Sequence, residues 1–251
     1  MGLAVVSRWK KSELALMRRR GFVPALISVA AALILPLFLA AEISWASYSI
    51  AAAITLFLGV WVIAMSLEDL WQKSSGRIAK ALKLSGSYWG MICAHIGLAV
   101  CVLGVGLTTV YDIQRDLRMA PGDRVEIPDY SFEFVGVEPV QGPNYSAYRG
   151  EVLVESEGQT IARLKPEKRS YKAGGQVMTE ADIDAGLFRD LFVSLGEPLG
   201  DQAWAVRLQV KPFVRWIWLG AILIALGGLI AAGDRRYRRR SSRSQVSEAK
   251  L

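Results

Sequence analysis

The sequence predicts a membrane protein with four transmembrane α-helices and an extracytoplasmic all-β domain, a small antiparallel barrel or sandwich, between the third and fourth helices. Four apolar runs of 18 to 23 residues carry almost no charge. The chain as a whole is 52% apolar, with a mean hydropathy of +0.28 over 251 residues. Between the third and fourth runs, apolar and polar residues alternate. Together these observations exclude an ordinary soluble domain and a disordered chain.

Each apolar run is long enough for a membrane-spanning helix. The runs cover residues 22–41, 50–67, 88–110 and 213–233. At 1.5 Å per residue, a helix of about 20 residues matches the roughly 30 Å hydrocarbon core of a bilayer. The fourth run contains only Arg215, which lies near enough to one end for its side chain to reach the interface. The first run exceeds the usual 7–15-residue core of a cleaved signal peptide, so we expect it to be an anchor.

Basic residues next to the runs predict the orientation. Lys and Arg gather in segments 1–21, 68–87 and 234–251, whereas residues 42–49 contain neither. The positive-inside rule therefore places both termini in the cytoplasm and residues 111–211 in the periplasm. Residues 111–211 have a net charge of −5, so the pI of about 9.5 comes from the basic segments outside them. We expect the basic tail to bind anionic lipid headgroups. Nucleic-acid binding is not expected.

The segment 111–211 has the alternation of half-buried β-strands. Apolar residues occur at every second position around residues 130–134, 152–154 and 204–210. Glu157-Gly158 predicts a tight hairpin turn, and residues 141–144 predict a looser one. One short helix is expected at Thr179–Leu187, where Thr179 would cap the first turn.

The chain offers few residues for catalysis. It holds one His and two Cys, and its single His lies in an apolar run apart from the Asp residues, which excludes a Ser-His-Asp triad. Cys93 and Cys101 belong to no CxxC or CxxCH pattern, so neither a zinc site nor covalent haem attachment is expected. We interpret both Cys as small core residues. No catalytic residue is predicted in this chain.

His95 is the candidate ligand. An imidazole about 10 Å inside a membrane helix needs a partner, either a hydrogen bond from a neighbouring helix or a metal or proton to bind. On the same helix, Gly90, Ala94, Gly97, Cys101 and Gly104 form a stripe of small residues that would let another helix approach closely, and His95 points about 140° away from it. A neutral imidazole is a good axial haem ligand. A bis-His haem site would need its second His from another polypeptide.

Six ordered blocks of the sequence resemble the C-terminal part of the CcmF family, the haem lyase subunit of the bacterial cytochrome c maturation system. The likeness extends from about residue 60 to Arg238. The blocks are YWGMICAHIG at 88–97, GVEPVQGPNY at 136–145, PEKR at 166–169, MTEADI at 178–183, LGEPLG at 195–200 and KPFVRWIWLG at 211–220.

The resemblance implies a role for one residue. In that family, the His of the Trp-Gly-Met-x-x-x-His block is one of two transmembrane His residues that bind a haem b, thought to supply electrons for reducing the haem delivered by CcmE. That role transfers to His95 as an axial ligand of the haem b iron. The family's other membrane His, its two outward-facing His residues and its tryptophan-rich segment have no counterpart here.

The resemblance also implies partners and a location. The expected partners are the N-terminal part of CcmF, the haem chaperone CcmE, CcmH with apocytochrome c, and the lipid of the bacterial inner membrane. Haem ligation is expected only together with the N-terminal part, and the chain is either a subunit of a split CcmF or a truncated product. Two alternatives remain: a non-catalytic scaffold that docks CcmH, with His95 structural, and an accessory subunit of a sensor or transporter.

Overall fold

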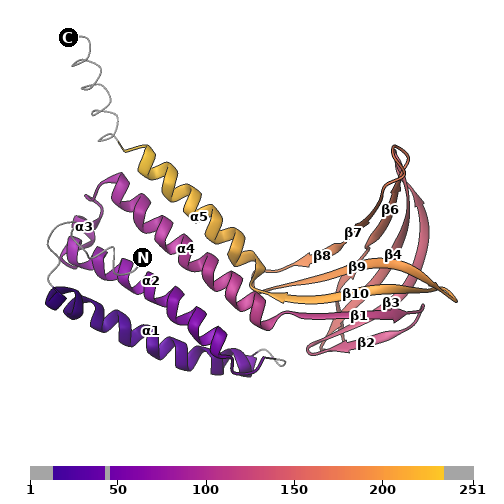
Figure 1. Cartoon of the computed structure of the whole chain (residues 1–251), viewed down its shortest axis with the longest axis horizontal. Helices are drawn as coiled ribbons and strands as arrows, with labels where there is room; N and C mark the ends of the chain where they lie inside the picture. Colours follow the sequence, from indigo (N-terminus) through magenta and orange to yellow (C-terminus); the bar gives the residue numbers. More distant parts are fainter. Residues whose placement is uncertain (1–13, 43–45, 235–251) are drawn as a thin grey trace, which may run out of the picture. The chain divides into compact units, whose positions relative to one another are not determined.

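The computed structural model describes residues 14–42 and 46–234 (Figure 1). The described residues form two units. A helical unit holds residues up to 39, residues 47–107 and residues from 216 onward, and a β unit holds residues 40–46 and 108–215. Most of the predicted basic segment 1–21 and all but the first residue of the predicted tail 234–251 lie outside the described residues.

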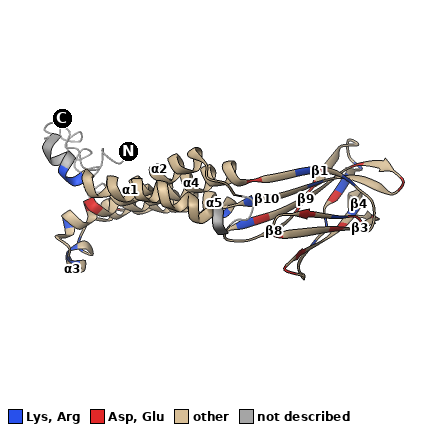
Figure 2. Cartoon of the chain, turned by 90° about the horizontal axis from the view of Figure 1, so that it is seen from below, with Lys and Arg blue, Asp and Glu red and all other residues tan. Residues whose placement is uncertain are grey.

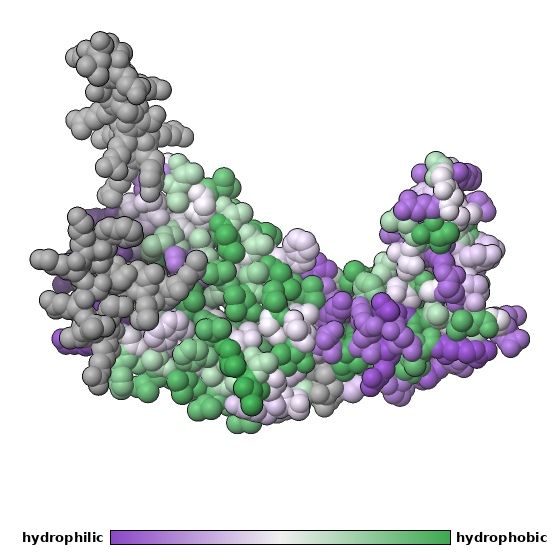
Figure 3. Space-filling view, in the orientation of Figure 1, coloured by the Kyte–Doolittle hydropathy of each residue, from purple (hydrophilic) through white to green (hydrophobic). Residues whose placement is uncertain are grey.

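The helices occur where the apolar runs predict them. They are α1 (Leu14–Glu42), α2 (Ile50–Ser74), the short α3 (Ile78–Ala81), α4 (Gly86–Tyr111) and α5 (Val214–Ala232). Among the described residues, the four longer helices have the length and hydropathy to cross a membrane, so the chain is a multi-pass membrane protein. Within the helical unit, Figure 2 draws the charged residues near the helix ends, and apolar side chains dominate the surface of that unit in Figure 3.

Local sequence explains where α2 begins and ends. Ser49 caps its first turn by accepting a hydrogen bond from the amide of Ala52 at 3.4 Å. At the other end, Ser75 and Gly76 adopt left-handed backbone conformations that stop the helix. The helix therefore continues seven residues past the apolar run 50–67 and includes the charged side chains of Asp69 and Lys73.

The β unit is a sandwich of two antiparallel sheets, which agrees with the predicted fold class. Its strands are β1 (Ile113–Met119), β2 (Arg124–Ile127), β3 (Tyr130–Gln141), β4 (Tyr145–Ser156), β5 (Gln159–Leu164), β6 (Glu167–Tyr171), β7 (Val177–Glu180), β8 (Asp182–Ala185), β9 (Arg189–Gly200) and β10 (Ala203–Pro212). One sheet has the order β1-β10-β9-β8, and the other has the order β2-β3-β4-β6-β7, with β5 also paired to β4.

Alternation along the strands builds one core between the sheets. Phe132 and Phe134 of β3 are fully buried, as are Val152 and Val154 of β4. The cluster is completed by Met119, Ile127, Leu164, Leu191, Val193, Leu195, Trp204, Val206, Leu208 and Val210. Because side chains alternate between the faces of a strand, the same strands present polar residues to solvent.

Both predicted turns are present. Glu157 and Gly158 have φ of 52° and 75° and join β4 to β5, which is the backbone of a type I′ hairpin. Residues 142–144 join β3 to β4. The structure adds a further two-residue turn, Asp201 and Gln202, which joins β9 to β10 with positive φ at both positions.

The helix predicted at Thr179–Leu187 is wrong. This segment forms β7 and β8, and at Ala181 the chain passes from one sheet to the other. The Thr179 hydroxyl donates to the carbonyl of Leu195 rather than capping a helix, and the Asp182 carboxylate accepts from the amide of Lys165 at 2.7 Å. A nine-residue helix has little stability of its own, so pairing with β6 and β9 decides the conformation.

Candidate functional site

His95 lies in the first half of α4 and is partly buried. Its Nδ1 is 2.8 Å from the backbone carbonyl of Met91, four residues earlier on the same helix. Since a carbonyl only accepts hydrogen bonds, Nδ1 carries the proton in this contact, and Nε2 is left with a lone pair. This is how metal-binding His side chains are usually held, with one nitrogen donating to a backbone carbonyl and the other free to bind.

The stripe of small residues on α4 packs against α5, as the sequence predicts. A Cβ added at Gly97 would come within 2.7 Å of the amide nitrogen of Ile224 and within 2.8 Å of the carbonyl oxygen of Gly220. In return, a Cβ at Gly220 would meet the amide nitrogen of Cys101 at 2.5 Å. Gly90 and Gly227 are related in the same way. The two helices therefore touch through their backbones, which only glycine at these positions allows.

The cysteines lie at this same contact. Cys93 Sγ is 3.3 Å from the carbonyl oxygen of Leu223 on α5, and Cys101 contacts α5 at Gly220. Both are free thiols. This placement agrees with their interpretation as small side chains in a helix interface.

A different side of α4 packs against α2. A Cβ at Gly59 would clash with the Leu103 side chain, and a Cβ at Gly106 would clash with Thr55. Ala99 of α4 is 1% exposed. At about 100° per residue, Leu103 and Gly106 lie about 80° and 20° from His95 around the helix axis, whereas Gly97 lies about 160° from it. His95 is thus at the margin of the α2 contact, on the side away from α5.

On the other side of His95, α4 is less tightly packed further along its length. Val105 is 47% exposed. It lies about 80° from His95 around the helix axis, in the direction away from the α2 contact, and ten residues, or about 15 Å, along it. Nearer the imidazole on that side, Met91 and Leu98 are partly buried.

The sequence analysis missed a polar cluster that ties α2 to α4. Asp69 on α2 is 4% exposed, and its Oδ2 accepts a hydrogen bond from the Tyr88 hydroxyl and one from Lys73 Nζ, both at 2.7 Å. The Lys73 ammonium also lies 4.2 Å from the centre of the Tyr88 ring. Asp69 and Lys73, four residues apart just beyond the second apolar run, are the signal in the sequence that could have indicated it.

Another α4–α5 link closes the same end of the helical unit. The Asp234 carboxylate accepts a hydrogen bond at 2.7 Å from the amide of Ser87, in the first turn of α4. An acidic group at a helix N-terminus satisfies amides that have no partner within the helix. With Asp69 and Asp234, α4 is fixed at this end to both of its neighbours.

The described residues hold no cluster of three or more His, Cys, Asp and Glu side chains that could bind a metal ion. A metal site within the described part of this chain would therefore have to rest on fewer protein ligands. A haem requires only one or two axial ligands from protein, and His95 fits that requirement.

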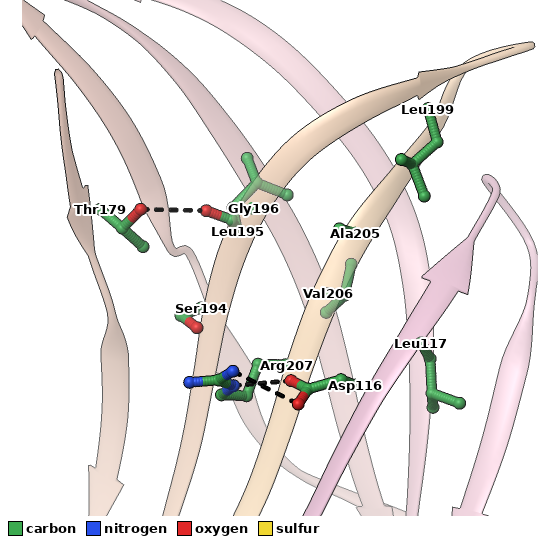
Figure 4. A pocket seen from close by; sticks show the side chains of 10 residues that line it. All are labelled: Asp116, Leu117, Thr179, Ser194, Leu195, Gly196, Leu199, Ala205, Val206 and Arg207. Carbon is green, nitrogen blue, oxygen red and sulfur yellow. Dashed lines mark hydrogen bonds and ion pairs between the residues drawn. The ribbon is translucent and has the colours of Figure 1, made fainter.

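The β unit carries a shallow hollow of about 580 Å³ across β9 and β10 (Figure 4). An ion pair occupies it: Arg207 Nε lies 2.6 Å from Asp116 Oδ1. The hydrogen bond from Arg207 lowers the pKa of Asp116 below its ordinary value. Asp116 is consequently a weak base at neutral pH.

Comparisons with known proteins agree on one family. The family model described as the CcmF C-terminal beta-sandwich matches residues 110–212. The cytochrome c-type biogenesis protein CcmF of Pseudomonas aeruginosa is 45% identical over 95% of this chain, and that of Escherichia coli is 38% identical over 96% of it. The chain spans about 36% of the length of either relative.

A solved structure has the same fold. The chain described as cytochrome c heme lyase CcmF superposes on 92% of this chain with a TM-score of 0.74 and 17% sequence identity, and 37% of that chain is covered.

Proposed function

We propose that this chain, which is similar to part of the CcmF proteins and carries a CcmF C-terminal beta-sandwich, forms part of a haem lyase that attaches haem to apocytochrome c, with His95 as one axial ligand of a haem b. The observation that carries the ligand assignment is the contact between His95 Nδ1 and the Met91 carbonyl. It supports the assignment, because a neutral imidazole that donates from Nδ1 leaves Nε2 able to bind iron.

His95 holds this geometry through the helices around it. The α4–α5 contact at Gly97 and the α2–α4 contacts at Leu103 and Gly106 fix the rotation of α4. Packing against both helices keeps His95 at the margin of the α2 contact. A bound haem b supplies one-electron chemistry, and this chain contributes a preset ligand and an apolar wall.

The second axial ligand comes from another polypeptide in this proposal. His95 is the only His of the chain. The matched relatives are almost three times as long as this chain, and the N-terminal part of CcmF is the source that we propose. Its helix would approach α4 on the side of His95 that faces away from the α5 contact at Gly97.

We further propose that the other partners are CcmE, CcmH and apocytochrome c, that the chain resides in the bacterial inner membrane, and that the β unit is periplasmic. The charges of the connection between α2 and α4 support this orientation. It carries Arg77, Lys80 and Lys83 and contains no acidic residue from Ser75 to Ser85. The β unit and the α2–α4 connection are reached from opposite ends of α4.

A reduced-minus-oxidised optical spectrum tests the ligand assignment. The chain is purified alone and together with the matching N-terminal half, each as wild type and as His95→Ala. The proposal predicts a b-type signal in the wild-type pair and its loss in the His95→Ala pair. Cys101→Ala, altered on the α5 side of α4, is the matched control and should keep the signal.

The same experiment distinguishes the haem-ligand proposal from the alternative that the chain is a docking scaffold. Equal haem content in wild type and His95→Ala, with c-type cytochrome maturation intact, would make His95 structural and the chain a docking scaffold. Unchanged c-type haem staining in cells that lack the chain would instead reject any role in cytochrome c maturation.

A further inference from the structure

An exposed apolar turn joins β8 to β9 within the β unit. Leu187 and Phe188 are 59% and 60% exposed, although the turn that carries them is held firmly. The Gly186 amide donates to the carbonyl of Arg189 at 2.9 Å and to Asp190 Oδ1 at 3.2 Å. A Cβ at Gly186 would meet that Arg189 carbonyl at 2.7 Å, so the tight turn requires glycine. Two large apolar side chains are thus presented on a fixed backbone.

Strand pairing and a hydrogen bond tie this turn to the residues directly before α5. The strand pairing sets Pro212 opposite Arg189, and the amide of Phe213 donates to the carbonyl of Phe188 at 2.9 Å. The Phe188 and Phe213 rings meet edge to face, 6.4 Å between centres. Val214, the next residue, is the first of α5.

The length of α5 sets the position of the membrane surface. Its 19 residues rise about 28 Å, which is nearly the full hydrocarbon thickness of about 30 Å. If this helix spans the bilayer, Phe213 lies at the interface. The first five residues of α5 also include Trp216 and Trp218, a residue type that gathers at membrane interfaces.

Charges next to the turn are already neutralised within the β unit. Arg189 forms an ion pair with Asp184, and the Arg189 guanidinium lies 5.6 Å from the centre of the Tyr130 ring. Asp190 pairs with Arg215 at 3.4 Å. Each acidic group beside the apolar tip therefore has a basic partner, which lowers the free energy needed to bring the turn to a headgroup layer.

We propose that Leu187 and Phe188 insert into the headgroup and acyl boundary of the bilayer and fix the β unit to the membrane surface. The occupant is lipid, because the turn is tied to Phe213, the residue directly before a helix long enough to span a membrane. Insertion would bury two side chains that water otherwise contacts.

Photo-crosslinking in the full chain tests this. Benzoylphenylalanine replaces Leu187 or Phe188 in the chain co-expressed with the N-terminal half and reconstituted in phosphatidylcholine–phosphatidylglycerol vesicles. Val177 on β7 is the matched control, since it is 56% exposed. Val177 belongs to the other sheet and begins β7 beside the β6–β7 turn. That turn lies next to the β3–β4 turn, because the Lys172 amide donates to the Asn144 carbonyl.

The proposal predicts lipid adducts, detected by mass, at least five-fold more abundant at positions 187 and 188 than at 177. Equal adduct yields at all three positions, or adducts at 187 and 188 to protein instead of lipid, would overturn it. A second measurement uses an environment-sensitive nitrobenzoxadiazole label on Leu187→Cys or Val177→Cys, with Cys93 and Cys101 replaced by Ala. The emission of the label at position 187 should shift to shorter wavelengths and be quenched by spin-labelled lipid. The emission of the label at position 177 should show neither change.

Discussion

The carboxylate of Asp190, near the start of β9, lies 3.4 Å from the guanidinium of Arg215, in the first turn of α5. Asp190 is 7% exposed, and its Oδ1 also accepts the amide of Gly186. One buried acid thus links the sheet end, the β8–β9 turn and the start of a membrane helix. A buried charge persists at such a place only where it has partners like these.

Asp190→Ala should loosen the β8–β9 turn. The variant leaves the Gly186 amide with only its backbone acceptor and Arg215 without its ion pair, so hydrogen exchange of the Gly186 and Leu187 amides should accelerate. Hydrogen-exchange mass spectrometry of the full chain in detergent measures this. Glu197→Ala, which removes an acid that is 75% exposed at its side chain, is the control. Equal exchange in both variants would show that Asp190 does not hold the turn.

Gly97→Ala should destabilise the helical unit. The added Cβ would come within 2.8 Å of α5 backbone atoms, so α4 and α5 must separate, and overpacking of this kind costs about 1–3 kcal/mol. Thermal unfolding of the full chain in detergent should show a lower midpoint. Gly228→Ala on α5 is the matched control, because a Cβ there meets nothing within 4 Å. A midpoint lowered equally by both changes would contradict the proposed backbone contact.

Tyr88→Phe should weaken the link between α2 and α4. The substitution removes the hydroxyl that donates to Asp69 at 2.7 Å and leaves a buried carboxylate with Lys73 as its remaining partner, a loss of about 1–3 kcal/mol. Unfolding in detergent measures the change. Gln72→Ala, which breaks an exposed hydrogen bond to Glu68 on the same helix, should have a much smaller effect. The idea fails if the two variants are equally stable.

Glu167 should make the β unit sensitive to acid. Burial raises the pKa of this carboxyl, but hydrogen bonds from Arg169 and Arg149 outweigh it and hold the pKa below its ordinary value near 4.5. Because the folded state has the lower pKa, Glu167 contributes stability above about pH 4.5, and this contribution is lost as the pH falls through the folded-state pKa.

The test is hydrogen exchange of core β4 amides between pH 3 and pH 7, corrected for the intrinsic exchange rate. Wild type should lose more protection than Glu167→Gln as the pH falls, and the variant should be less stable by about 1–3 kcal/mol at neutral pH. Glu133→Gln, whose partner Arg124 is 46% exposed at its side chain, is the control. Parallel pH profiles for wild type and Glu167→Gln would rule out this role.

Local patterns in the sequence were enough for the features that depend on near neighbours. Apolar runs without charge predicted the four long helices, because a lipid-facing segment must satisfy its backbone internally and expose apolar side chains. Alternation predicted the strands, and Glu157-Gly158 predicted its turn because few residue pairs accept positive φ twice. Gly90 and Gly97 showed that α4 would meet another helix, although not which one.

The tertiary structure decided what depends on distant partners. Thr179–Leu187 became two strands because β6 and β9 supply hydrogen bonds that a short helix cannot match. The choice of α5 as partner of the glycine stripe, and the burial of Asp69 against Tyr88, rest on residues far apart in the sequence. His95 could be named from the sequence as a candidate ligand. Its Nδ1 contact with Met91 and its position at the margin of the α2 contact emerged only once the helices were packed.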